Sequence, residues 1–272
     1  MSDLDPPRDH GAARRLLAGW RSLIQFLGTT SQHERHRFFT MCGRKIRVVG
    51  QHEFEDYADQ ALQSRLQIAT NRLAEEFEGL YDRDEIEAAV EESARSLSSH
   101  GVTPYVHILA ERFTRERLRA QAQSEHRIAK TAPEVVFVSL TGGGRAQIGA
   151  ALLARQAGEA VSVHSAGSSV AAEVDPCVRA VLEEVGIDVT EAFTKPISPE
   201  VLASADVVIT MGRSVGVVEI PPTVRHLDWR VGDPAGTDVD EARRVRDDIE
   251  RRIAAFMRDV LPELTSTPAA QE

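Results

Sequence analysis

The stretch VVFVSLTGGGRAQ, residues 135–147, decides the fold of the second half of this chain. Its first four residues are β-branched or aromatic and lack polar alternation, which is typical of a short strand buried on both faces of a parallel sheet. Glycines follow, and apolar residues at Ile148, Leu152 and Leu153 indicate that a helix begins near Arg145. The stretch therefore predicts a strand, a glycine-rich loop and a helix.

The loop has the composition of an anion-binding site. Unpaired backbone N–H groups and the positive end of the helix macrodipole meet at such a turn, and Arg145 adds a permanent charge with several donors. Glycines after a strand also form ordinary tight turns. The loop lacks the Gly-Lys-Ser/Thr ending of a Walker loop and the G-x-G-x-x-G spacing of dinucleotide-binding sites. The residues predicted to bind an oxyanion are Leu140, Thr141, Gly142, Gly143, Gly144 and Arg145.

Four further segments extend the pattern of this loop, so that it runs from residue 135 to about residue 261. They are VSVHSAG (161–167), DPCVRAVLEEVGID (175–188), ADVVITMG (205–212) and LDWRVGDPAGTDVDEARRVRDDIERRI (227–253). In these segments the chain resembles the low-molecular-weight tyrosine phosphatases and the related thiol-dependent arsenate reductases, which carry a Cys-x5-Arg loop after the first strand and a late Asp-Pro general acid. The resemblance implies that Arg145 binds the anion and that Asp233 is the general acid, and the sequence Asp-Pro-Ala-Gly leans towards the arsenate reductases.

The chain departs from this family where the resemblance places the nucleophile. Ser139 stands at the position of the family's cysteine, Gly143 at that of a loop asparagine, and Ala146 at that of a hydroxyl residue. An alcohol is far less acidic than a thiol and needs a general base before it can attack. His164, at the end of the next predicted strand, is the one residue considered as that base, although a lone histidine is more often structural. Arsenate reduction requires a thiol, which Ser139 does not supply.

Two hypotheses for the function follow. The first is a pseudoenzyme of the phosphatase fold that binds phosphate, arsenate or a phosphorylated partner without cysteine-based turnover, with Ser139 at an inactive nucleophile position. The alternative is an active arsenate reductase or phosphatase-like enzyme whose altered site uses Ser139 and Asp233. A weaker third reading is an interaction scaffold whose loop binds no anion. None of these implies a cofactor or a metal ion.

Five segments are expected along the chain. Residues 1–50 form a basic, partly disordered extension, 51–125 a bundle of three amphipathic helices, and 126–133 a polar linker ending in proline. Residues 134–263 form an α/β domain with a parallel sheet, and 264–272 a disordered tail. The sheet is expected to use strands at 135–138, 161–164, 207–210 and 224–227, with helices at 176–185 and 239–260.

The predicted bundle resembles the three-helix domain that precedes the phosphatase-like domain in some actinobacterial arsenate reductase relatives. Asp82 or Asp84 is expected to cap its second helix. Its charged residues, Arg115 and Arg117 among them, are expected to be solvated by default, and dimerisation through the bundle is possible. Thr103 and Pro104 fit the start of its third helix.

Composition excludes several classes. The 272 residues are 42% hydrophobic with no apolar run of 18 residues, so a cytoplasmic protein without a transmembrane segment is expected. A net charge of −10 argues against nucleic-acid binding, although residues 12–27 could form a basic amphipathic helix. Cys42 and Cys177 make no disulfide framework, and Cys177 is expected to be a half-buried packing thiol. The spacing of His33, His36 and Cys42 does not form a recognisable metal site.

Overall fold

A computed structural model describes residues 38–41, 44–47, 51–99, 105–140, 144–167, 174–188, 195–212 and 218–266. The chain forms two compact units, Met1–Ala61 and Leu62–Glu272. In the first, β1 (Phe38–Met41) and β2 (Arg44–Arg47) pair as an antiparallel hairpin, which the sequence did not predict. The predicted basic helix at 12–27, and Thr103 and Pro104, lie outside the described residues.

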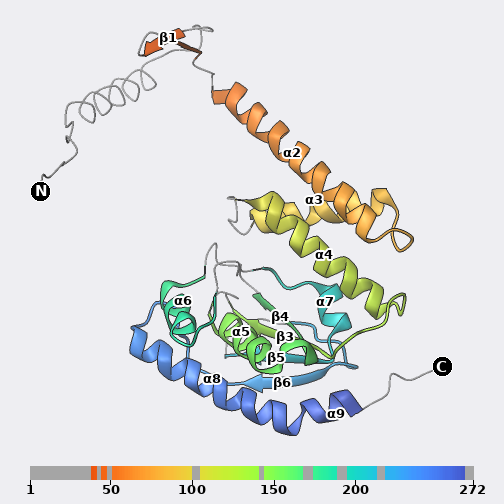
Figure 1. The fold of residues 1–272 in the computed structure, drawn as a ribbon, viewed down its shortest axis with the longest axis vertical. Helices are drawn as coiled ribbons and strands as arrows, with labels where there is room; N and C mark the ends of the chain where they lie inside the picture. The colour runs from red at the N-terminus through yellow and green to blue at the C-terminus, as the bar shows by residue number, and fades with distance from the viewer. Residues whose placement is uncertain are drawn as a thin grey trace, which may run out of the picture. The chain divides into compact units, whose positions relative to one another are not determined.

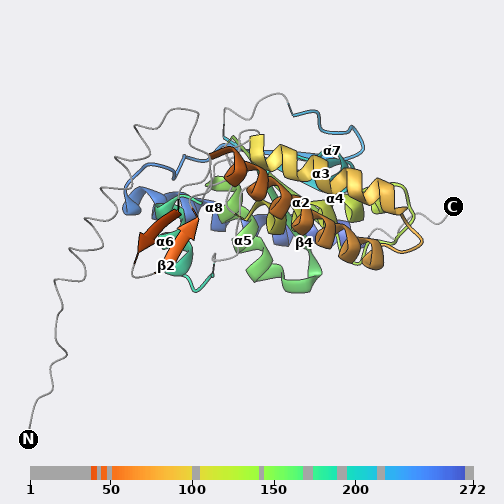
Figure 2. The ribbon, with the colours of Figure 1, turned by 90° about the horizontal axis from the view of Figure 1, so that it is seen from above.

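Three long helices follow the hairpin, as the sequence predicts. They are α2 (Gln51–Glu76), α3 (Arg83–Ser99) and α4 (Val106–Ser124), and α3 packs along α4 (Figures 1 and 2). An ion pair of 2.7 Å between Arg115 and Glu76 ties α4 to the end of α2. The apolar residues recur every three or four positions and bury one side of each helix. The largest buried side chains of this core are Leu66, Leu73, Phe77, Ile86, Val90, Leu97, Phe113 and Leu118.

A reciprocal capping box fixes the start of α3. Asp82 Oδ1 accepts a hydrogen bond of 2.8 Å from the backbone N–H of Glu85, and Glu85 Oε2 accepts one of 2.8 Å from the N–H of Asp82. Two N–H groups at the helix start are thereby satisfied. Of the two candidates for this cap, Asp82 is confirmed.

Four parallel strands form the sheet of the second half in the order β4-β3-β5-β6. They are β3 (Glu134–Ser139), β4 (Ser162–Gly167), β5 (Val207–Met211) and β6 (Arg225–Trp229). The predicted parallel sheet is confirmed, and β4 extends three residues beyond its predicted end. The whole of β3 is buried, as its unbroken apolar run indicated.

Helices cover both faces of this sheet (Figure 1). One face packs Val135 and Phe137 against α5 (Arg145–Ala157), α6 (Pro176–Glu183) and α8 (Val239–Asp259), and the short 3-10 helix η1 (Gly158–Ala160) follows α5. On the other face, Val136 and Val138 pack against α7 (Pro199–Ser204) and against Ala120 of α4. The last helix, α9 (Leu261–Ser266), extends past the predicted start of the tail. Helix α4 therefore packs against both the other helices of the bundle and the sheet. The predicted domain boundaries stay a prediction.

Arg117 of α4 is largely buried between α3 and α7, so the prediction of a solvated side chain is wrong. Only 13% of its side chain is exposed, and its Nη2 lies 2.7 Å from Glu200 Oε1 of α7 and 2.8 Å from Glu92 Oε2 of α3. Its Nη1 donates to Ser93 Oγ at 3.2 Å. Burial of a guanidinium requires such partners.

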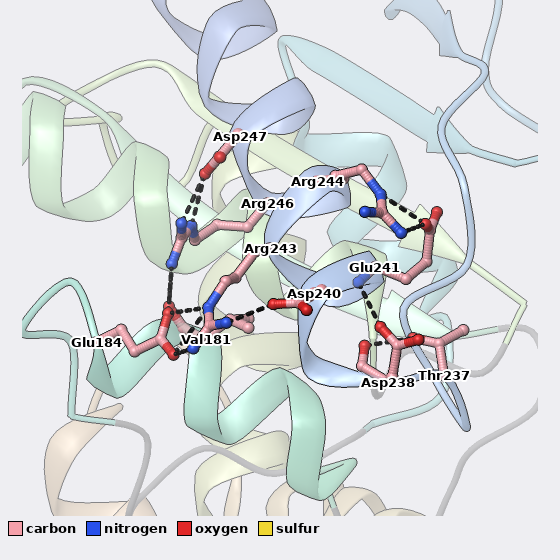
Figure 3. A network of polar contacts seen from close by, with 10 residues as sticks. All are labelled: Val181, Glu184, Thr237, Asp238, Asp240, Glu241, Arg243, Arg244, Arg246 and Asp247. Atoms are coloured by element: carbon pink, nitrogen blue, oxygen red, sulfur yellow. Dashed lines mark hydrogen bonds and ion pairs between the residues drawn. The ribbon is translucent and has the colours of Figure 1, made fainter.

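Arginines near the start of α8 form ion pairs with Glu184, which follows α6, and with neighbouring acidic residues of α8 (Figure 3). Arg243 contacts Glu184 at 2.5 Å and Asp240 at 2.6 Å, and Arg246 bridges Glu184 to the carbonyl oxygen of Val181 at 3.1 Å each. The pairs of Arg243 are exposed to solvent, which screens the charges, so they contribute little to stability. Within the described part of the chain, no helix is long and apolar enough to cross a membrane.

Candidate functional site

Ser139 ends β3 at the carboxyl edge of the sheet. In the strand register it lies beside Gly167, the last residue of β4, and Met211, the last residue of β5. Ligands of open parallel sheets bind outside this edge. Ser139 is 1% exposed, whereas Leu140 after it is 36% exposed. The loop therefore leaves the core immediately after the serine.

Helix α5 begins at Arg145, as predicted, with Gly144 at its N-cap position. No side chain caps this end, because glycine has none to offer, and the first helical hydrogen bond runs from Ile148 N–H to the Gly144 carbonyl at 3.0 Å. An uncapped first turn presents backbone N–H groups to an anion. The predicted loop residues Thr141, Gly142 and Gly143 lie outside the described residues.

The Arg145 guanidinium is packed over Gly212, the residue that follows β5. A Cβ atom on Gly212 would lie 2.5 Å from Nη1 and 2.7 Å from Cζ of Arg145, and the φ angle of Gly212 is +91°. The φ angle favours glycine at this position, and the missing Cβ atom leaves the space that the guanidinium occupies. Sequence reasoning did not assign Gly212 to the site, although a glycine directly after a buried strand is a signal for close approach.

Arg145 is only 8% exposed, yet its donors are incompletely used. Its Nη2 lies 3.2 Å from Asp233 Oδ2, and its buried Nε has no hydrogen-bond partner among the described residues. Buried guanidinium donors normally find acceptors. The structure thus brings Arg145 and Asp233 together, and no described residue accepts a hydrogen bond from Arg145 Nε.

Asp233 faces the loop from the segment before α8. Its side chain is 49% exposed, its Oδ1 accepts from the N–H of Ala235 at 3.2 Å, and the neighbouring Pro234 lies 3.5 Å from where a Cβ atom on Gly144 would be. Asp233 and Pro234 therefore lie beside Gly144 and Arg145, where α5 begins.

Comparison with known proteins identifies the family of this chain. A family model for low-molecular-weight phosphotyrosine protein phosphatases matches residues 134–266, and one for the N-terminal domain of phosphatase-like proteins matches residues 66–122. A putative arsenate reductase of Halobacterium salinarum is 31% identical over 132 residues, which cover 47% of this chain and 92% of that protein. The chain belongs to the low-molecular-weight phosphotyrosine protein phosphatase family.

Two further relatives extend the comparison within this phosphatase family. An arsenate reductase of Bacillus cereus is 34% identical over 126 residues, covering 45% of this chain and 93% of the relative. The solved structure of a thioredoxin-dependent arsenate reductase of Corynebacterium glutamicum is 34% identical, with a TM-score of 0.66, and covers 73% of this chain and 97% of its own. That match extends beyond the phosphatase domain into the helical region.

His164 lies away from Ser139, so the hypothesis that it is the base for Ser139 is wrong. It pairs with Val136 in the strand register, three residues before the level of Ser139, which is about 10 Å along the sheet. Its Nε2 lies 2.7 Å from Glu134 Oε2. Its Nδ1 lies 2.7 Å from Glu116 Oε1 of α4, an ion pair poorly aligned for a hydrogen bond. Glu116 also pairs with Lys195. His164 is therefore part of the interface between α4 and the sheet.

The other polar candidates in the phosphatase domain are structural. Cys177 lies in α6, is half-buried, and its thiol donates to the carbonyl oxygen of Thr237 at 3.2 Å, as expected of a packing thiol. Across the described ranges, no group of three or more His, Cys, Asp or Glu side chains is arranged to hold a metal ion.

Proposed function

We propose that this member of the phosphatase family binds a phosphate- or arsenate-like oxyanion in the loop from Ser139 to Arg145, without the cysteine-based turnover of the family. The observation that carries the proposal is the buried Nε of Arg145, a donor beside the loop with no acceptor among the described residues. A tetrahedral oxyanion accepts from Nε and Nη together, which is the geometry that a guanidinium offers. Relatives named arsenate reductases support the choice of anion.

The absence of turnover is argued from Ser139. A thiol has a pKa near 8.5 and is readily ionised by a helix N-terminus and an arginine, whereas an alcohol requires a general base. His164, the base considered from the sequence, is bound to Glu116 and Glu134 instead. Arg145, the residue that would bind the anion, is kept, and the site has no thiolate. Binding of a phosphorylated partner and dimerisation through the bundle stay predictions.

Arg145→Ala is expected to weaken the binding of inorganic phosphate by at least 100-fold. Two charge-assisted hydrogen bonds are lost, each about 1.5–3 kcal/mol, and 1.4 kcal/mol corresponds to a tenfold change in affinity. Isothermal titration calorimetry with phosphate and with arsenate measures the loss. Arg251→Ala is the matched control, because Arg251 is an arginine of α8 that is 70% exposed and pairs with Asp248. Equal affinities in the parent and Arg145→Ala would contradict the proposal, as would a parent that binds neither anion.

Gly212→Ala is expected to weaken phosphate binding about tenfold, because the added methyl group displaces the Arg145 guanidinium. An alanine held at this positive φ angle is also strained, which lowers the free energy of unfolding by about 1–2 kcal/mol. Gly186→Ala separates the two effects, since Gly186 has a φ angle of +76° and no atom within 4 Å of the added group. Calorimetry and thermal unfolding of both variants check this. The same loss of affinity in both variants would show that Gly212 acts only through the backbone.

A further inference from the structure

Helix α6 holds the loop that carries Asp233. The backbone N–H of Gly236, in that loop, donates to Asp175 Oδ2 at 3.1 Å. The other oxygen of the same carboxylate, Oδ1, caps α6 by accepting from Cys177 N–H at 2.8 Å and Val178 N–H at 3.4 Å. One side chain therefore satisfies its own helix and a backbone group 61 residues away.

Hydrogen bonds within the segment 233–237 connect Gly236 with Asp233. Thr237 Oγ1 donates to the carbonyl oxygen of Pro234 at 2.8 Å, and Ala235 N–H donates to Asp233 Oδ1 at 3.2 Å. Gly236 has a φ angle of +69°, as a tight turn requires. Cys177 adds a second tie from α6 through its thiol to Thr237. The turn from Asp233 to Thr237 is therefore fixed to the start of α6.

We infer that Asp175 is a positioning residue that holds Asp233 against Arg145 through the N–H of Gly236. This inference rests on the proposed anion site. Asp233 Oδ2 lies 3.2 Å from Arg145 Nη2, so its negative charge repels an incoming oxyanion and competes for the same guanidinium. Asp175 thereby limits the affinity of the site, and a change that releases the loop strengthens anion binding.

Asp175→Asn isolates this contact. Asparagine caps a helix about as well as aspartate, so the cap of α6 is retained, whereas its NH₂ group does not accept a hydrogen bond from Gly236. The matched control is Asp82→Asn, which makes the same substitution at the N-cap of α3. The affinity for inorganic phosphate is measured by calorimetry for the parent, Asp175→Asn, Asp233→Asn, the double variant and the control.

Asp233→Asn is expected to bind phosphate about 3- to 10-fold more tightly, since one like charge near the anion is removed at an interaction energy of about 1 kcal/mol in a solvent-exposed site. Asp175→Asn is expected to tighten binding in the same direction, and the double variant to match Asp233→Asn alone, because both act through one group. Asp82→Asn is expected to leave the affinity unchanged. If Asp175 only stabilised the fold, Asp175→Asn would weaken phosphate binding instead. Weaker or unchanged binding in Asp175→Asn, or additive effects, would overturn the inference.

Amide hydrogen exchange separates this inference from the proposed function. Asp175→Asn is expected to speed exchange of the Gly236 amide at least tenfold, while Asp82→Asn leaves it unchanged, because only the first removes its acceptor. If the parent binds no phosphate but the Gly236 amide exchanges faster in Asp175→Asn, the proposed anion site is wrong, whereas the hydrogen bond from Gly236 to Asp175 is confirmed. An unchanged rate at Gly236 overturns the positioning role whatever the affinity.

Discussion

Ser139→Cys is expected to raise turnover of an aryl phosphate by at least about 10³-fold over the parent chain. Loss of a nucleophile in hydrolases costs roughly 10⁴–10⁶ in kcat, and the smaller gain expected here allows for the loop groups replaced by Gly143 and Ala146. The thiol would lie at the carboxyl end of β3, before the N-terminus of α5 and near Arg145, a setting that stabilises a thiolate. Release of a colorimetric phenol measures the rate.

Two combinations show whether the restored rate uses the existing site. Ser139→Cys with Arg145→Ala is expected to lose the gain almost completely, because the arginine binds the transferred group. Ser139→Cys with Asp233→Asn is expected to slow esters with poor leaving groups most, as loss of a general acid does. Ser139→Ala is expected to be as inactive as the parent. A parent that turns over the ester, with the rate abolished in Ser139→Ala, would contradict the proposed function and require a serine mechanism.

Arsenate provides an independent assay of the same variants. Its reduction needs a thiol that bonds to arsenic and supplies electrons, and the hydroxyl of Ser139 does neither. The parent is therefore expected to bind arsenate without reducing it in the presence of an external thiol. Thiol-dependent reduction by the parent would show that another group in the chain supplies this chemistry.

The strand, loop and helix around residues 135–147 were predictable because a short apolar run and the glycines after it are local signals. The same holds for the cap by Asp82, where one carboxylate serves N–H groups a few residues away. Arg117 and His164 were misjudged for the opposite reason. The period of α4 tells which side of the helix is buried, but not that the sheet covers part of its polar side.

The contacts that Gly212 and Asp175 make could not be predicted from the sequence, because they join distant residues. Gly212 and Asp175 act on residues far away in the chain, and no spacing rule connects Asp175 with Gly236 or Gly212 with Arg145. The hairpin of β1 and β2 was missed because its strands are four residues each and carry no clear apolar alternation. The sequence therefore predicts which loop would bind an anion, whereas the contacts of Arg145 and Asp233 could be found only in the structure.

Charged residues at the interface of α4 with the sheet allow the second large effect to be predicted. Burial alone would raise the pKa of Glu116, but Lys195 and His164 lower it to about 2. Burial alone would lower the pKa of His164, but its contacts with Glu116 and Glu134 raise it to about 9. Both pKa shifts favour the charged forms, so Glu116 and His164 are charged in the folded protein and attract each other.

Glu116→Ala is expected to lower the free energy of unfolding by about 3–5 kcal/mol, since it leaves His164 and Lys195 as largely buried cations without this partner. For a chain of this size that lowers Tm by roughly 10 °C. Glu91→Ala is the matched control, because Glu91 is an exposed residue of α3. Urea unfolding of both variants measures the difference. A loss no larger than that of the control would show that these charges contribute nothing net.

The pH dependence of unfolding tests the same group by its sign. The folded pKa of His164 is above its ordinary value of 6.5, so its stabilisation is complete below about pH 6.5 and is lost as pH rises through about 9. The difference corresponds to a fall on the order of 3 kcal/mol over that range. His164→Gln should remove most of this slope, and Glu116→Ala should reduce it, because the carboxylate that raises the pKa is gone. A parent whose stability does not fall between pH 6.5 and 9 would show that His164 is not held charged at this interface.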